Sequence, residues 1–186
     1  ILMVQGLVNS FGTVIMAAFA AAVKIDSFAY MPVQDFGNAF STYVAQNYGA
    51  GQTDRIKKGI RSAGVCSAVF CVCISVLVCA FAAPLMGIFI DPGEGAIIAA
   101  GVHYLRIEGA CYIGIGILFL LYGYYRAVNQ PQMSVILTIA SLGTRVALAY
   151  LLSATPLGVT GIWLSVPIGW ALADIIGIAY YWKKKR

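Results

Sequence analysis

Six ionisable side chains lie inside otherwise apolar segments of this chain, and their types and placement make them the first candidates for chemistry. They are Lys24, Asp26, Arg106, Glu108, Arg145 and Asp174. Counted inward from the ends of their segments, all six come out near the middle of a bilayer if the segments span one. Charges at that depth are costly and normally face a partner or an aqueous cavity. Three cations and three anions therefore predict mutual pairing inside a cavity between helices.

Glu108 is the strongest single candidate among these residues. On a continuous helix it would share one face with Tyr104 and Tyr112, four residues away on either side. A buried carboxylate flanked by phenols can bind a proton or Na⁺, or hold a cationic substrate. The structural alternative is an ion pair with Arg145 or Lys24, and the sequence leaves both interpretations open.

Asp26 is a second candidate for an ion-coupling or substrate-binding role. It lies two residues from Lys24, as Glu108 lies two residues from Arg106, and side chains so spaced do not face each other on a helix. All four side chains must therefore find partners on other helices. We expect Lys24 and Arg106 to act as structural charge partners.

Asp35 and Asp174 complete the set of acidic candidates. Asp35 follows Pro32, whose ring removes a backbone hydrogen bond and predicts a kink. A kink toward a cavity would make Asp35 a site residue, whereas a mechanical hinge would not. Asp174 lies in the last apolar segment and is expected to balance Arg145.

Other kinds of chemistry are not indicated by the sequence. The five cysteines form no C-x-x-C pair and lie in apolar surroundings, so neither a metal site nor a disulfide framework is expected. No catalytic triad is recognisable, and the glycines near position 50 lack the strand and helix context of a phosphate-binding loop. We therefore expect no metal, no cofactor and no enzymatic activity.

Composition assigns the chain to the polytopic membrane proteins. Hydrophobic residues make up 61% of the 186 residues and charged residues 10%, against roughly half and roughly a quarter in soluble domains. Long uncharged runs cover the whole length, and about 20 apolar residues suffice to cross a bilayer. The pattern predicts one all-α transmembrane unit over residues 1–186, with a partial first helix at 1–11 and further helices at about 13–47, 55–90, 95–127, 132–152 and 159–182.

The net charge of +5 is distributed unevenly along the chain. Basic residues gather at 55–61, at Arg126 and in the KKKR tail at 183–186, whereas the hairpin around 91–94 is acidic. Because cytoplasmic loops are rich in Lys and Arg, this alternation predicts a multi-pass protein of the plasma (cell inner) membrane with a cytoplasmic C-terminus. The tail is expected to contact membrane lipid and not nucleic acid.

Three stretches resemble the multidrug and toxic compound extrusion (MATE) transporters. MP at 31–32 with AQNYGAG at 45–51 and the basic turn is similar to their eighth helix and the following loop. GYYRA at 123–127 with QP at 130–131 is similar to the end of their tenth helix, and LGVTGIW at 157–163 to the start of their twelfth. The resemblance implies the C-terminal six-helix lobe of a twelve-helix antiporter, with a truncated first helix.

The resemblance further implies export of cationic or amphipathic drugs and metabolites in exchange for Na⁺ or H⁺ by alternating access. The partner would be the N-terminal lobe of the same transporter or another half. Some relatives bind the ion through an aspartate in the tenth helix, but Ile115 occupies that position here. The alternatives are a lipid-linked sugar flippase of related fold and a membrane scaffold fragment that does not transport.

Overall fold

The computed structural model describes residues 2–185, which form helices and turns and contain no strand. The helices are α1 (Leu2–Asn9), α2 (Thr13–Gly49), α3 (Thr53–Ala80), α4 (Ala82–Met86), α5 (Gly95–Gly109), α6 (Tyr112–Ala127), α7 (Pro131–Ser153) and α8 (Val159–Lys185). The predicted all-α architecture is confirmed. Of the basic tail at 183–186, Arg186 lies outside the described residues, as does Ile1 of the first predicted helix.

Several of these helices are long and apolar enough to cross a bilayer. Four helices, α2, α3, α7 and α8, meet that requirement singly. The bent pair α5 and α6 adds a fifth span if the two helices are counted together. The described chain is therefore a multi-pass membrane protein, as the composition predicts.

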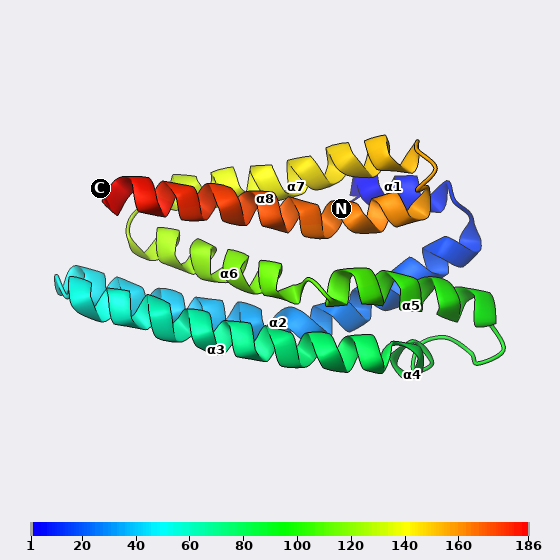
Figure 1. The fold of residues 1–186 in the computed structure, drawn as a ribbon, viewed down its shortest axis with the longest axis horizontal. Coiled ribbons are helices and arrows are strands. Elements are labelled where there is room, and N and C mark those ends of the chain that lie inside the picture. Colours follow the sequence, from blue (N-terminus) through cyan, green and yellow to red (C-terminus); the bar gives the residue numbers. More distant parts are fainter. Residues whose placement is uncertain (1, 186) are drawn as a thin grey trace.

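The helices form an elongated bundle in which α6 has the central position (Figure 1). It contacts α2 and α3 on one side and α7 and α8 on the other. The short α1 packs against α2, α7 and α8. Residues of α2, α5 and α6 are thereby brought together inside the bundle although they are far apart in sequence.

Glycines allow two pairs of helices to approach closely. A Cβ atom at Gly123 of α6 would lie 2.6 Å from the carbonyl oxygen of Gly37 in α2, and one at Gly169 of α8 would lie 2.7 Å from that of Ser141 in α7. Such distances leave no room for a side chain against a rigid backbone. The α2–α6 contact fixes the relative height of the two helices that carry Asp26 and Tyr112.

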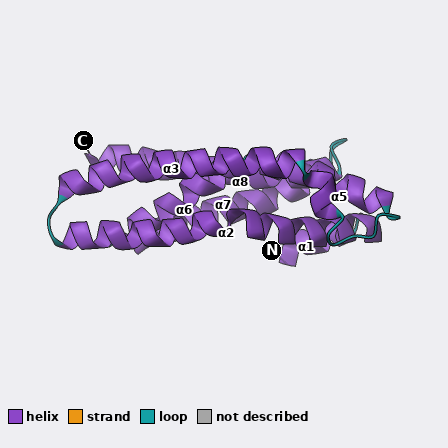
Figure 2. Cartoon of the chain, turned by 90° about the horizontal axis from the view of Figure 1, so that it is seen from below, coloured by secondary structure: helices purple, strands orange, loops and turns teal. Residues whose placement is uncertain are grey.

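The connections gather at two opposite ends of the bundle. The α2–α3 turn, the α6–α7 turn and the C-terminal end of α8 lie at one end, and Figure 2 shows the α4–α5 connection at the other. Two of the turns at the first end contain left-handed residues, Gly51 with φ 68° and Asn129 with φ 57°. The basic segments of the sequence therefore share one end, and acidic Asp91 and Glu94 lie at the opposite one.

Two helices predicted as continuous are interrupted. The predicted helix at 55–90 breaks at Phe81, because Pro84 would clash with the carbonyl of Ala80 in a continuous helix but is tolerated in the first turn of a new one. The predicted helix at 95–127 breaks at residues 110–111, where α5 and α6 meet at 52°. There the backbone amide of Cys111 donates to the carbonyl of Glu108. This hydrogen bond spans three residues, one fewer than in an α-helix, so the turn is tighter.

The expected kink at Pro32 does not end the helix. α2 runs from Thr13 through Pro32 to Gly49 as one helical segment. Figure 1 shows that it bends between its N-terminal and C-terminal halves, which is the usual response of a helix to an internal proline.

We expect Gly123→Ala to destabilise the fold by about 1–3 kcal/mol, because the new methyl group meets backbone atoms that cannot move aside. The matched control is Gly143→Ala in α7, where a Cβ would meet nothing within 4 Å. That change should be neutral or stabilise by up to about 1 kcal/mol through helix propensity. Thermal unfolding of the purified protein in detergent measures both, and equal behaviour of the two variants would contradict the close α2–α6 contact.

Candidate functional site

A cavity of about 330 Å³ lies inside the bundle between α2, α5, α6, α7 and α8. Its polar lining includes Asp26 from α2, Tyr104 and Glu108 from α5, and Arg145 from α7. Asp26 and Glu108 each expose only 3% of their surface, and Tyr104 exposes 2%. The structure therefore brings the two favoured carboxyl groups into one buried site.

Asp26 is the centre of the polar contacts in this cavity. The hydroxyl of Tyr112, at the start of α6, donates a hydrogen bond to its Oδ1. Glu108 and Tyr104 line the same cavity as Asp26. Arg145 is close enough to act electrostatically on both carboxyl groups, without forming an ion-pair contact to either.

The break between α5 and α6 places Glu108 and Tyr112 on separate helices. The expectation that both share one face of a continuous helix is therefore wrong. Tyr112 instead opens the new helix and bonds to Asp26 on α2, so the phenol serves the neighbouring helix and not Glu108. Interrupted helices at membrane depth are tolerated where they line a cavity, which is their situation here.

An aromatic cluster beside the cavity holds Tyr104 in position. Its ring meets that of Trp163 edge to face at 4.9 Å and that of Phe19 at 5.8 Å, while Phe19 and Trp163 stack at 5.5 Å. Trp163 exposes 1% of its surface. Edge-to-face and stacked contacts favour one ring orientation, so the hydroxyl of Tyr104 is directed toward the carboxyl groups.

Two polar atoms of the site have no hydrogen-bond partner among the described residues. They are Oε1 of Glu108 and Nε of Arg145, both buried. Buried polar atoms are normally paired. The cavity thus presents an acceptor and a donor to any ion or small molecule that enters it.

The proposed pairing of three cations with three anions is wrong for the described residues. Within residues 2–185 the ion pair that forms is on the surface, between Asp54 and Lys57 at 3.3 Å. Lys24 is exposed, and its Nζ lies 5.7 Å from the centroid of the Phe89 ring. Arg106 is also exposed, so neither cation reaches the cavity.

The remaining acidic candidates lie elsewhere in the lobe. Asp174 is buried on α8 at 7% exposure, and its Oδ1 has no partner among the described residues. Its expected pairing with Arg145 does not form. Asp35 is exposed on α2 beyond Pro32 and does not line the cavity, so its role stays a prediction.

Several lining residues were not singled out from the sequence. They are Gln5, Tyr122, Thr138, Ser141 and Trp170. Each of them has a polar or aromatic side chain within an apolar helix, and no other feature of the sequence indicates that it lines a cavity. Within residues 2–185, no group of three or more His, Cys, Asp or Glu residues could hold a metal ion.

The fold and the buried carboxyl groups define the class of this chain, a multi-pass helical membrane protein with a candidate polar site in its interior. Comparison with known proteins identifies the family. The family model described as MatE matches residues 2–151. The chain therefore belongs to the MatE family, the multidrug and toxic compound extrusion transporters, and the resemblance seen in its sequence is confirmed.

Individual relatives are longer than this chain. "Probable multidrug resistance protein YoeA" of Bacillus subtilis is 27% identical over 184 residues, which cover 96% of this chain and 39% of that protein. "Probable multidrug resistance protein YpnP" of the same organism is 29% identical over 188 residues, which cover 98% and 42%. The chain thus spans about two fifths of the length of the curated relatives it matches.

A solved MATE transporter in complex with MaL6 has the same fold over this region. It matches with a TM-score of 0.91 and 19% identity, covering 98% of this chain and 42% of that structure. The predicted MATE-type membrane fold, in which this chain corresponds to part of a transporter, is confirmed by this match.

We expect Tyr112→Phe to reduce the free energy of unfolding by about 1–3 kcal/mol, because it removes the hydroxyl that satisfies buried Asp26. The control is Tyr150→Phe, whose exposed hydroxyl bonds to the carbonyl of Met3 at 3.3 Å and should matter by less than about 0.5 kcal/mol. Thermal unfolding in detergent compares the two variants. An equal effect would show that the Tyr112–Asp26 bond does not hold the site together.

Proposed function

We propose that this chain forms the C-terminal lobe of a secondary active antiporter. The transporter exports cationic or amphipathic drugs and metabolites in exchange for Na⁺ or H⁺ by alternating access. The observation that carries the proposal is the burial of Asp26 and Glu108 together in one cavity of a MATE-family bundle. The names of the two Bacillus subtilis relatives support multidrug export as the activity.

The two carboxyl groups supply a physical basis for ion coupling. Neighbouring carboxylates in a low-dielectric interior repel each other, and a bound proton or cation relieves the repulsion. The positive charge of Arg145 partly offsets the same repulsion, so a bound ion can leave again. Binding and release of one cation at Asp26 and Glu108 would then change the charge of the lobe interior.

The lining of the cavity also suits a flat or hydrophobic cation. Phe19, Tyr30 and Trp170 contribute aromatic surface next to the carboxyl groups, and aromatic faces attract cations. A volume of about 330 Å³ lies at the lower limit for pockets that bind drug-sized molecules. Part of the substrate would therefore lie against the second lobe.

The partners in this proposal are the substrate, membrane lipid and the N-terminal lobe of the same transporter or another half. Alternating access requires two lobes that rock against each other around a central site. The proposed activity is transport and not enzymatic catalysis. It uses Na⁺ or H⁺ as the coupling ion and no cofactor.

The proposed location is the plasma membrane with the C-terminus in the cytoplasm. Support comes from the distribution of charge, because the basic start of α3, the basic end of α6 and the basic end of α8 share one end of the bundle (Figure 1). Positive loops are retained on the cytoplasmic side.

We expect Glu108→Gln and Asp26→Asn to abolish ion-driven drug efflux in cells expressing the complete transporter. The measurement imposes a Na⁺ or an H⁺ gradient separately and follows a fluorescent cationic substrate. Glu94→Gln, in the exposed α4–α5 connection, is the matched control and should retain efflux. Efflux by one gradient alone identifies the ion, and Asp35→Asn tests the exposed aspartate in the same assay.

Two results would contradict this proposal. Unchanged efflux in both cavity variants would move ion coupling to the other lobe and leave Asp26 and Glu108 structural. A complete transporter without efflux under either gradient would favour the flippase or the scaffold.

We expect Lys58→Cys to react with a membrane-impermeant maleimide only after cells are permeabilised, and Glu94→Cys to react in intact cells. Both positions are exposed and lie at opposite ends of the bundle. The unmodified protein controls for the native cysteines, which lie in the spanning helices or at the α5–α6 break. The reverse labelling pattern would place the C-terminus outside the cell.

A further inference from the structure

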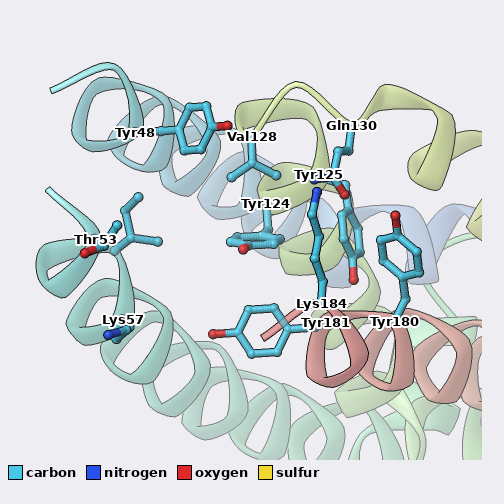
Figure 3. Close-up of a pocket in the computed structure, with 11 residues that line it drawn as sticks. Tyr48, Thr53, Lys57, Tyr124, Tyr125, Val128, Gln130, Tyr180, Tyr181 and Lys184 are labelled. Atoms are coloured by element: carbon cyan, nitrogen blue, oxygen red, sulfur yellow. The ribbon is translucent and has the colours of Figure 1, made fainter. Parts of the chain in front are cut away.

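A second cavity, of about 280 Å³, lies at the basic end of the bundle, well apart from the buried carboxyl groups. It forms where the α2–α3 turn, the α6–α7 turn and the last turns of α8 come together (Figure 3). It shares no lining residue with the cavity around Asp26 and Glu108. We therefore expect this cavity to bind a different kind of ligand from the cavity around Asp26 and Glu108.

Tyrosine is the commonest residue in the wall of this cavity. Five of them line it: Tyr48, Tyr124, Tyr125, Tyr180 and Tyr181. The rings of Tyr124 and Tyr181 meet at 5.4 Å, and those of Tyr125 and Tyr180 at 5.8 Å, all edge to face. The hydroxyl of Tyr125 is fixed by a 2.6 Å hydrogen bond to the carbonyl of Gly177. These contacts join α6 to α8 and hold the tyrosines that line the cavity in fixed positions.

The charged lining residues are both lysines. Lys57 enters from α3 and Lys184 from α8, and the lining includes no carboxylate. In Figure 3 Lys184 extends along Tyr125 toward Gln130. Asp54 contacts Lys57 at 3.3 Å, but both side chains are largely exposed, at 86% and 55%, and such surface pairs bind weakly. The two lysines lie on opposite sides of the cavity (Figure 3), so both raise its positive potential and favour an anionic ligand.

Gln130 adds a buried hydrogen-bond acceptor to the cavity. Its Oε1 is buried and has no partner among the described residues. The residue is held in place because its amide bonds to the carbonyl of Tyr125 at 2.9 Å, directly before Pro131 begins α7. An unpartnered buried acceptor calls for a donor group on the ligand, such as a hydroxyl next to the anionic group.

The position of the cavity selects an amphiphile as the source of that anion. The spanning helix α3 begins beside the cavity and the spanning helix α8 ends beside it. Tyrosines at the ends of spanning helices lie at the level of lipid headgroups. Basic pockets between transmembrane helices at this level bind phosphate-containing headgroups. The volume is slightly below that of pockets for drug-sized ligands, which suits a headgroup and excludes a whole lipid.

We propose that this cavity binds the headgroup of an anionic phospholipid that carries a phosphate and a hydroxyl group, as phosphatidylglycerol does. Lys184 contacts the phosphate, Lys57 on the opposite wall adds to the positive potential of the cavity, a glycerol hydroxyl donates to Gln130, and the tyrosine rings flank the glycerol. The acyl chains run along the lipid-facing surface of the bundle. A bound lipid joins the ends of α3, α6 and α8.

The test measures lipid binding directly on the complete transporter, delipidated in mild detergent. Native mass spectrometry gives the apparent Kd of phosphatidylglycerol and of uncharged phosphatidylcholine. We compare Lys57→Gln/Lys184→Gln with Lys58→Gln/Lys183→Gln, which removes the same charge from exposed neighbours outside the cavity. Inorganic phosphate is added in a parallel series to separate a free anion from a lipid.

We expect the cavity variant to bind phosphatidylglycerol about 30-fold more weakly, since each lysine near the headgroups contributes about a factor of five. The control variant should keep wild-type affinity, and phosphatidylcholine binding should not change. Equal losses in both variants would show diffuse surface attraction and overturn the site, as would no loss in either. Displacement of the lipid by equimolar inorganic phosphate would show that the ligand is a free anion.

This inference goes beyond the proposed transport function and does not rest on it. Lipid binding is measured without an ion gradient and without a drug. A failure of lipid binding therefore leaves the antiporter proposal intact, and a failure of efflux leaves the lipid site intact.

Discussion

The burial of carboxyl groups inside an apolar bundle is the constraint on which the rest of this structure depends. Asp26 and Glu108 are almost fully removed from the surface, and isolated charges in such surroundings are strongly disfavoured. The hydrogen bond from Tyr112, the nearby guanidinium of Arg145 and the cavity that both carboxyl groups share reduce that cost. The helix break before Tyr112 and the close approach of α2 and α6 both bring these groups together.

Many large apolar side chains lie on the surface of the bundle, whereas in a soluble protein most of them are buried. Large hydrophobic residues such as Val76, Ile139 and Ile175 expose more than 60% of their surface, whereas three of the acidic residues, Asp26, Glu108 and Asp174, are buried. In a bilayer the outer surface meets hydrocarbon, so exposed apolar groups cost little and polar groups must be satisfied within the protein. Lys24 departs from this pattern, because its side chain is exposed and its Nζ lies over the ring of Phe89.

The two cavities divide the polar chemistry of the lobe between its interior and one end. The interior cavity is acidic and aromatic, and it lies beside a helix break, where small shifts of α5 against α6 would change its shape. The cavity at the end of the bundle is basic and lies between two connections and the last turns of α8. In the two proposals, ions and substrates bind in the first cavity and anionic headgroups in the second, so the two sites would share helices without competing for a ligand.

The sequence by itself determined the membrane class, the approximate helices and the family, because apolar run length and short motifs such as AQNYGAG are local properties. It also selected Asp26, Glu108, Tyr104 and Arg145 as candidates. Only the tertiary structure decided which of them meet. Helix rotation, the break at 110–111 and the approach at Gly123 set whether a charge points inward. Lys24 and Arg106 consequently face outward, although their depth in the sequence pattern matches that of their acidic neighbours.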